Sequence, residues 1–188
     1  PVFVVLDQMP SMFFGTAQVF KSLVASQIAS QLMWNTLANG DRFGALLFSQ
    51  NRHFEMKPSS NRRNCMRLLN RIVENYSLTL TDVFGKSPDQ SNQHEESNEN
   101  QFADTLKRLK FLAKPGTLIH LVSDFNSFDE NCARHLSKLS QHADIHCILV
   151  NDPIEKNLPP AGLYGITNGN TNGLLNTDNN DLRKDYRE

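Results

Sequence analysis

Short apolar runs and longer stretches with helical spacing alternate along this chain. The apolar runs have the length of strands that are buried on both faces, and they cover residues 2–7, 42–50, 117–123 and 143–152. The helical stretches repeat apolar residues every third or fourth position, and they cover residues 17–38, 59–76, 101–113 and 129–141. This alternation, with short connections, predicts an α/β fold with a doubly wound, mostly parallel sheet flanked by helices.

Three further stretches depart from this alternation. Residues 53–58 (HFEMKP) alternate directly after the second apolar run, which predicts an antiparallel strand at one edge of the sheet. Residues 162–178 (GLYGITNGNTNGLLNTD) carry Gly and Asn at turn positions, as is typical of a β-hairpin. Residues 78–99 are polar, mildly acidic and without sustained helical spacing, so we expect them to be among the most mobile parts of the chain.

Length and charge limit the number of domains and the kinds of partner. A chain of 188 residues is long enough to bury one proper core, so we expect residues 1–188 to form a single domain. Nineteen basic and twenty acidic side chains leave a net charge of −1. This balance gives no electrostatic reason to expect nucleic acid or an anionic membrane surface as a partner.

Cysteine usage and hydropathy suggest where the protein resides. The three cysteines (Cys65, Cys132 and Cys147) are widely spaced and form no Cys-x-x-Cys pair, so we interpret them as buried free thiols in a reducing cytoplasm. No apolar run is long enough to span a bilayer, so we expect no membrane contact from this segment. Because the chain opens directly in a strand, we expect it to be part of a longer protein, whose membrane anchor, if it has one, lies outside these residues.

Three of the predicted strands end in a carboxylate, namely Asp7, Asp124 and Asp152. The carboxyl ends of parallel strands share one edge of a sheet, so Asp7 and Asp124 lie close together if their strands are neighbours. Two close carboxylates repel each other unless protons or a cation neutralise them, and Mg²⁺ is a common solution. The other interpretation is that Asp7 accepts hydrogen bonds from turn N–H groups near Ser11 and the start of the helix.

Enzymatic interpretations of Asp7 meet a specific obstacle. A phosphatase of the haloacid dehalogenase type needs a second carboxylate two residues after its nucleophile, but position 9 is Met9. A response-regulator receiver needs an acidic pair that "DQM" does not provide, and Ser11 lacks the Gly-x-Ser-x-Gly elbow of a hydrolase. We therefore expect no catalytic residue and no small-molecule substrate. The alternative is an Mg²⁺-dependent phosphate-handling hydrolase that uses Asp7 and Asp124.

The first strand and its turn resemble the adhesion site of von Willebrand factor A-type domains. That metal-ion-dependent site has Asp-x-Ser-x-Ser after the first strand, a Thr from a later loop, and an Asp after the fourth strand. Four segments together resemble the bacterial family of domain of unknown function 58: "VFVVLDQMPSMFFGT", "NGDRFGALLFS", "LKRLKFLAKPGTLIHLVSDF" and "NDPIEKNLPPAGLYGITNG". This resemblance implies a von Willebrand A-like fold, a protein-binding function and a partner among the MoxR-type AAA+ ATPases.

The departures from the adhesion motif weaken the implied metal site. The resemblance maps ligands onto Asp7, Ser11 and Asp124, with Asn100 near the position of the loop Thr, whereas Met9 replaces the first serine. Because a thioether does not replace an oxygen ligand for a hard ion, we expect at most weak Mg²⁺ binding and no other cofactor. A serine at position 9 would restore a hydroxyl ligand.

The same edge of the sheet is the expected partner surface. Its predicted contact residues are Met9, Ser11, Met12 and Phe13. The alternative for the aromatic residues of this segment is that they pack the following helix onto the sheet.

Overall fold

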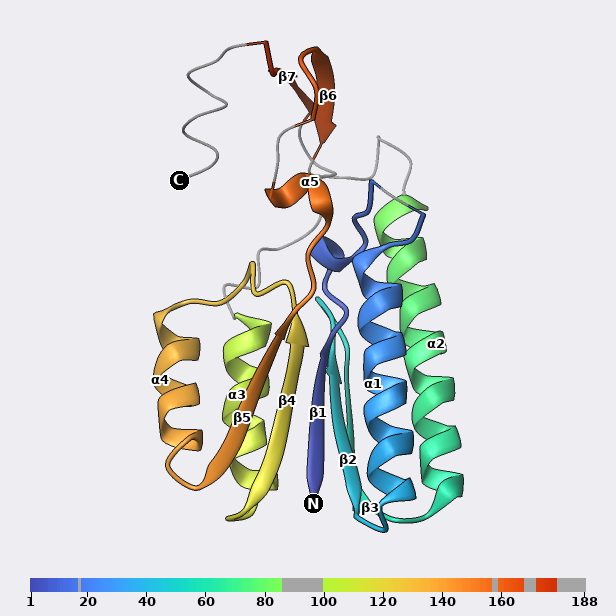
Figure 1. The fold of residues 1–188 in the computed structure, drawn as a ribbon, viewed down its shortest axis with the longest axis vertical. Helices are drawn as coiled ribbons and strands as arrows, with labels where there is room; N and C mark the ends of the chain where they lie inside the picture. Colours follow the sequence, from blue (N-terminus) through green and yellow to red (C-terminus); the bar gives the residue numbers. More distant parts are fainter. Residues whose placement is uncertain (17, 86–99, 157–158, 168–171, 179–188) are drawn as a thin grey trace.

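A five-stranded sheet forms the centre of the computed structural model, which describes residues 1–16, 18–85, 100–156, 159–167 and 172–178 (Figure 1). The strands are β1 (Val2–Asp7), β2 (Phe43–Phe48), β3 (His53–Ser59), β4 (Thr117–Ser123) and β5 (Ala143–Leu149). Their order in the sheet is β3-β2-β1-β4-β5. All neighbours are parallel except β3, which runs antiparallel to β2 at one edge. The predicted fold class and the predicted edge strand are therefore confirmed.

Strand register brings the carboxyl ends of the central strands to one edge. In the sheet Asp7 of β1 lies opposite Phe48 of β2, and Leu6 lies opposite Val122 of β4. The chain leaves β4 directly before Asp124, so Asp7 and Asp124 follow neighbouring strands at the same edge, as the alternating pattern predicts. We call this edge the carboxyl edge.

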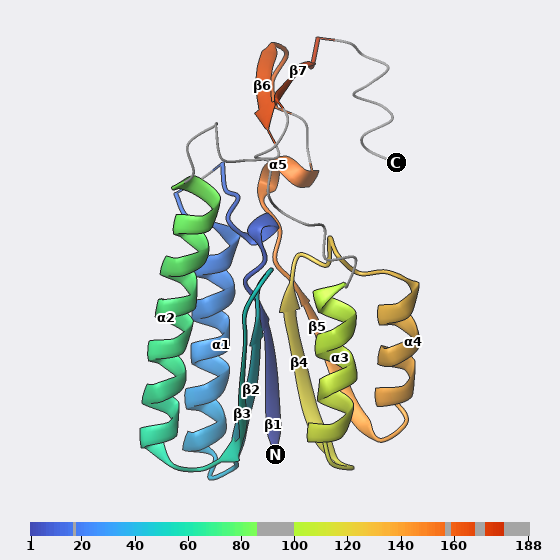
Figure 2. The same ribbon diagram turned by 180° about the vertical axis from the view of Figure 1, so that it is seen from behind.

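Two helices cover each face of the sheet. α1 (Lys21–Ala38) and α2 (Arg62–Phe84) lie on one face, and α3 (Gln101–Leu112) and α4 (Glu130–Leu139) lie on the other (Figure 2). Successive side chains of β1 point to opposite faces, so Val4 and Leu6 pack under α1 and α2 whereas Phe3 and Val5 pack under α3 and α4. Burial on both faces explains why β1 is an almost continuous apolar run.

The largest differences from the predicted helix boundaries concern the start of α1 and the end of α2. Pro10–Met12 form a short 3₁₀ turn (η1), and α1 begins at Lys21 and not at residue 17. α2 extends beyond the predicted end at residue 76 to Phe84, because Tyr76 and Leu80 continue its apolar stripe against the core. Residues 78–84 are therefore helical and not irregular, while residues 86–99 of the same prediction lie outside the described residues.

The last described elements lie beyond the carboxyl edge. They are the short helix α5 (Pro153–Lys156) and an antiparallel hairpin of β6 (Leu163–Thr167) and β7 (Asn172–Asn176), which confirms the predicted hairpin (Figure 1).

Two further expectations concern the burial of the cysteines and the length of apolar helices. All three cysteines are free thiols, but Cys147 is exposed, unlike the buried Cys65 and Cys132. This exposure corrects the prediction that all three are buried. Among the described residues, no helix has the length and apolar character that crossing a membrane requires.

Candidate functional site

Asp7 is buried at the carboxyl edge and is held by two donors of the chain itself. Its Oδ1 accepts a hydrogen bond from the backbone N–H of Met9 (2.8 Å), and its Oδ2 accepts one from the Ser123 hydroxyl (2.5 Å). Burial raises the pKa of Asp7 to about 7, and the negative charge of Asp124 also raises it. The hydrogen bonds from Ser123 and Met9 lower this pKa, but by less. The interpretation of Asp7 as an acceptor of turn N–H groups is thus confirmed at Met9.

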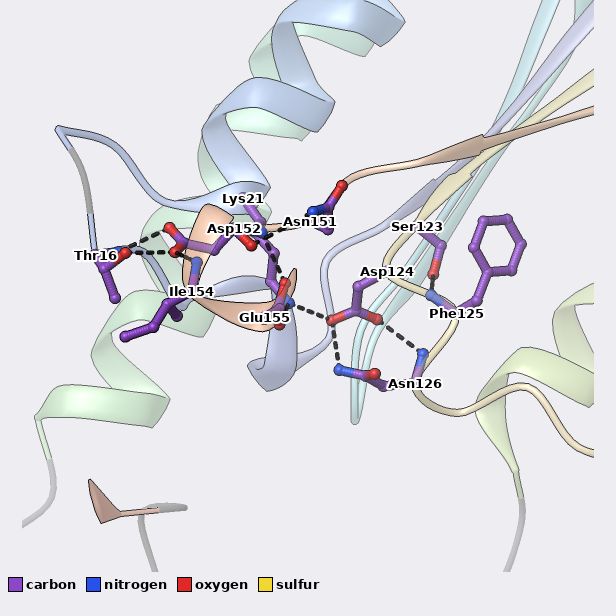
Figure 3. A network of polar contacts seen from close by, with 10 residues as sticks. All are labelled: Thr16, Lys21, Ser123, Asp124, Phe125, Asn126, Asn151, Asp152, Ile154 and Glu155. Carbon is purple, nitrogen blue, oxygen red and sulfur yellow. Dashed lines mark hydrogen bonds and ion pairs between the residues drawn. The ribbon is translucent and has the colours of Figure 1, made fainter. Parts of the chain in front are cut away.

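A buried lysine provides the positive charge at this edge. The ammonium of Lys21 lies 2.9 Å from Asp124 Oδ2 and 2.6 Å from Glu155 Oε1 (Figure 3). The side chains of Lys21 and Asp124 are both only 3% exposed, whereas that of Glu155 is 32% exposed. Burial lowers the pKa of Lys21, but the carboxylates of Glu155 and Asp124 raise it by more. The pKa of Lys21 is therefore raised, and the side chain keeps its proton and its positive charge.

The position of Lys21 in its helix makes these carboxylates necessary. Lys21 is the first residue of α1, where unpaired backbone N–H groups and the helix dipole disfavour a cation. No acidic residue lies in the first turn of α1. Asp124 from the end of β4 and Glu155 from α5 therefore provide the negative charge that this helix lacks.

The remaining hydrogen bonds of Asp124 shape the turn after β4. Asp124 Oδ1 accepts from the backbone N–H of Asn126 and Oδ2 from its side-chain amide, both at 3.0 Å. Ser123 Oγ, which donates to Asp7, accepts from the N–H of Phe125 at 2.8 Å. Phe125 has a φ of 57°, a conformation that a non-glycine residue adopts only when its surroundings favour it. The turn is therefore fixed by the two side chains that end β4.

The third strand-end carboxylate, Asp152, connects the loop after β1 to α5 (Figure 3). Its side chain accepts hydrogen bonds from the backbone N–H of Thr16 (2.8 Å), from the Thr16 hydroxyl, and from the N–H of Ile154 (3.0 Å). Although burial raises the pKa of Asp152, the hydrogen bonds from Thr16 lower it below its usual value. The backbone N–H of Asp152 in turn donates to Glu155 Oε2 at 2.7 Å. All three predicted strand-end carboxylates thus belong to one edge.

The structure places the other predicted site residues in different environments. The Ser11 hydroxyl is buried and has no hydrogen-bond partner among the described residues. Met9 is half-buried and packs against the core under α3 and α4. Asn100 is the N-cap of α3: its amide oxygen accepts from the N–H groups of Phe102 and Ala103, and its amide nitrogen donates to the Ser127 carbonyl.

Two predicted partner contacts lie in the core. Met12 is fully buried and Phe13 is 4% exposed, and both pack with residues of α1 and α2. Phe13 contacts the rings of Phe20 and Tyr76, so it packs the helices onto the sheet, as the alternative interpretation held. Met12 and Phe13 therefore have no surface to offer a partner.

Other apolar side chains are exposed beside the carboxyl edge. Phe14 is 42% exposed, Val19 45% and Phe84 60%. Phe84 stacks on Phe20 with 5.8 Å between ring centroids, and the Phe14 ring lies 5.8 Å from the Lys21 ammonium. We call Phe14, Val19 and Phe84 the edge patch. Its members come from the loop before α1 and from the end of α2.

With the Lys21 ammonium in place, the described residues around Asp7 and Asp124 do not fit Mg²⁺, and without the ammonium they would offer the ion only a weak set of oxygen ligands. An ion bound to Asp124 Oδ2 at the usual distance of about 2.1 Å would lie within about 5 Å of the Lys21 ammonium, which is 2.9 Å from the same oxygen. Both oxygens of Asp7 already accept hydrogen bonds, and the Asn100 oxygen caps α3. The unpartnered Ser11 hydroxyl is one oxygen where a magnesium ion prefers six.

Sequence reasoning did not identify Lys21, Ser123 or Glu155. One signal for Lys21 was available, since it is the only charged residue in the 18 residues of α1 (KSLVASQIASQLMWNTLA). A cation is disfavoured at the N-terminus of a helix, so a lysine there with no acidic residue in the same turn favours a carboxylate partner from elsewhere in the fold. Ser123 and Glu155 gave no such signal, because only the fold brings them to Asp7 and Lys21.

Comparison with known proteins gives a family, and it gives distant similarities among solved structures. The chain is similar to the VWA domain of SpRpn10 in its crystal structure, with 10% sequence identity and a TM-score of 0.36. That similarity covers 80% of this chain and 88% of the SpRpn10 chain. No curated protein matches the chain. The family described as "Protein of unknown function DUF58" matches residues 1–188 in full, and the chain therefore belongs to the DUF58 family.

Proposed function

We propose that this DUF58 chain is a non-enzymatic protein-interaction domain whose partner surface is the carboxyl edge. The observation that supports this most strongly is the way the edge is held together. Its three carboxylates bind groups of the chain itself, which fixes the loop after β1, the turn after β4 and α5 relative to one another. These buried contacts hold the loop that carries Phe14 and Val19 of the exposed edge patch, which suits recognition of another protein, since a preformed surface loses little entropy on binding.

The environment of Asp7 supports a non-enzymatic role. Asp7 is 1% exposed, and both of its oxygens accept hydrogen bonds, so it lacks the access that a nucleophile needs. Position 9, where the phosphatase chemistry requires a second carboxylate, is Met9. These two features favour protein binding over the Mg²⁺-dependent hydrolase.

The partner we propose is an AAA+ ATPase of the MoxR type, in a bacterial cytoplasm, working in the assembly or remodelling of other proteins. The support is the resemblance of this chain to domains commonly encoded beside such ATPases, together with membership of the DUF58 family. On this proposal the carboxyl edge is a degenerate form of the metal-ion-dependent adhesion site.

A binding experiment with paired variants tests the proposal. A MoxR-type AAA+ ATPase from the same organism is purified, and its affinity for the wild-type chain is compared with that for Phe84→Ser and Phe111→Ser. Both phenylalanines are exposed, at 60% and 82%, but Phe84 belongs to the edge patch whereas Phe111 lies near the far end of α3.

We expect Phe84→Ser to weaken binding about tenfold or more and Phe111→Ser to leave it unchanged. Equal affinities for all three proteins, or a loss confined to Phe111→Ser, would place the interface elsewhere. If the wild-type chain does not bind the ATPase, the proposed partner is wrong.

A further inference from the structure

We propose that the Lys21 ammonium is the resident cation of the carboxyl edge, in the place that the adhesion-site resemblance gives to a divalent ion. The site then holds its carboxylates together without any metal. This inference does not rest on the proposed partner, because it concerns what neutralises the site in the isolated chain.

The charge balance of the site supports this role for Lys21. Two carboxylates, Asp124 and Glu155, directly contact a single ammonium at 2.9 and 2.6 Å. Asp7 adds a third carboxyl group nearby, which is held by neutral donors from Met9 and Ser123. The Lys21 ammonium thus lies between carboxylates that would otherwise repel each other and require a bound cation.

Burial makes the ammonium a permanent part of the site. The Lys21 side chain is only 3% exposed and starts from the first residue of α1. Moving it into water would break two short ion pairs and would leave Asp124, also 3% exposed, without a cation. A divalent ion therefore cannot enter simply by displacing a mobile surface lysine.

The ammonium also connects segments that a metal would otherwise join. Lys21 begins α1, Asp124 follows β4 and Glu155 belongs to α5, so one side chain joins three elements at the carboxyl edge (Figure 3). In a metal-dependent site the ion holds such segments together only while it is bound. Here the connection is covalently attached to the chain and persists in the presence of chelators.

Calorimetric titration with MgCl₂ tests the inference on three forms of the chain: wild type, Lys21→Met and Lys156→Met. Met keeps the length and the apolar stem of Lys but removes its charge. Lys156 is an exposed lysine on α5 and serves as the matched control. We expect no saturable binding at millimolar Mg²⁺ for wild type and Lys156→Met, and measurable binding for Lys21→Met, whose carboxylates have lost their cation.

Two other outcomes of this titration would overturn the inference. Micromolar Mg²⁺ binding by the wild-type chain overturns the inference. Absence of binding by Lys21→Met also overturns it, because the oxygen set itself, and not the ammonium, would then exclude the ion.

A second measurement on the wild-type chain does not depend on whether Lys21→Met folds. Mn²⁺ is added, and the paramagnetic broadening of backbone amide signals is recorded. Unbroadened signals of Gln8 and Phe125 support the inference, and selective broadening of both signals contradicts it. Since neither experiment contains a partner protein, failure here is distinct from failure of the proposed interaction.

Discussion

The ammonium of Lys21 lies 2.9 Å from Asp124 Oδ2, although 103 residues separate the two in the chain. Both side chains are 3% exposed, so this is a buried ion pair between the start of α1 and the end of β4. The pair joins α1 to the turn after β4 at the carboxyl edge, where the strand-end carboxylates Asp7, Asp124 and Asp152 lie.

Removal of the lysine charge should destabilise the fold. In Lys21→Met, Asp124 stays buried without its cation, and loss of one partner of a buried pair typically costs about 3–5 kcal/mol. We expect a decrease of this size in the free energy of unfolding, measured by urea denaturation in metal-free buffer. Lys156→Met, at an exposed position, should change it by less than about 0.5 kcal/mol. Equal stabilities of the two variants would show that the Lys21 pair contributes nothing net.

The raised pKa of Asp7 predicts a pH dependence of stability that Asp7→Asn removes. With a folded pKa of about 7 and an ordinary value of 3.8, folded Asp7 retains a proton that the unfolded chain releases. Its contribution to stability is therefore complete below about pH 4 and is lost as the pH rises through about 7.

Unfolding of the wild type and of Asp7→Asn at pH 5 and pH 8 measures this effect. Between these pH values the wild type should lose about 3 kcal/mol relative to the variant. A wild type that gains stability relative to Asp7→Asn on going to pH 8 would show that the pKa of Asp7 is lowered and not raised.

The Ser123 hydroxyl should contribute to the stability of the turn after β4. Ser123→Ala removes the hydrogen bond to Asp7 and the one from the Phe125 N–H, and it leaves a buried carboxyl oxygen with one donor fewer. We expect a loss of about 1–3 kcal/mol in the free energy of unfolding by urea denaturation. Ser140→Ala removes one hydrogen bond at the exposed end of α4 and should cost less than half as much. A larger loss for Ser140→Ala would contradict the role given to Ser123.

Met9→Ser alone should leave Mg²⁺ affinity unchanged. On the sequence, a serine at position 9 restores a hydroxyl ligand, and each oxygen contact to a charged group is worth about tenfold in affinity. This expectation changes because the Lys21 ammonium lies 2.9 Å from Asp124. An added serine hydroxyl does not remove the repulsion between this ammonium and a bound Mg²⁺. The double variant Met9→Ser/Lys21→Met should bind Mg²⁺ about tenfold more tightly than Lys21→Met in calorimetry. Tight binding by Met9→Ser alone would contradict the account.

The sheet was predictable from the sequence because its strands are buried on both faces. A strand such as β1, with Phe3 and Val5 under one pair of helices and Val4 and Leu6 under the other, reads as a continuous apolar run. The positions of Asp7, Asp124 and Asp152 at one edge follow from parallel pairing. The extension of α2 to Phe84 was missed, because polar residues such as Thr81 conceal a stripe that Tyr76 and Leu80 continue.

Side-chain partners were less predictable than strand ends. The sequence shows that Asp7 and Asp124 need neutralisation, but the cation, Lys21, is the first residue of α1, four residues after the predicted start, and its ion pair with Asp124 leaves no periodic signal in the sequence. The 3₁₀ turn at Pro10–Met12 decides which side chains of residues 12–14 (MFF) are exposed. Met12 and Phe13 are buried, and Phe14 is exposed. Turn geometry of this kind has no periodic signature in the sequence.

The most direct test of Lys21 as the resident cation is a crystal structure of the wild-type chain grown in millimolar MnCl₂, with anomalous diffraction data. We expect density for the Lys21 ammonium between Asp124 and Glu155, as in Figure 3, and no anomalous peak at the carboxyl edge. An anomalous peak bound by Asp7, Ser11 and Asp124, with the Lys21 side chain turned away, would contradict it.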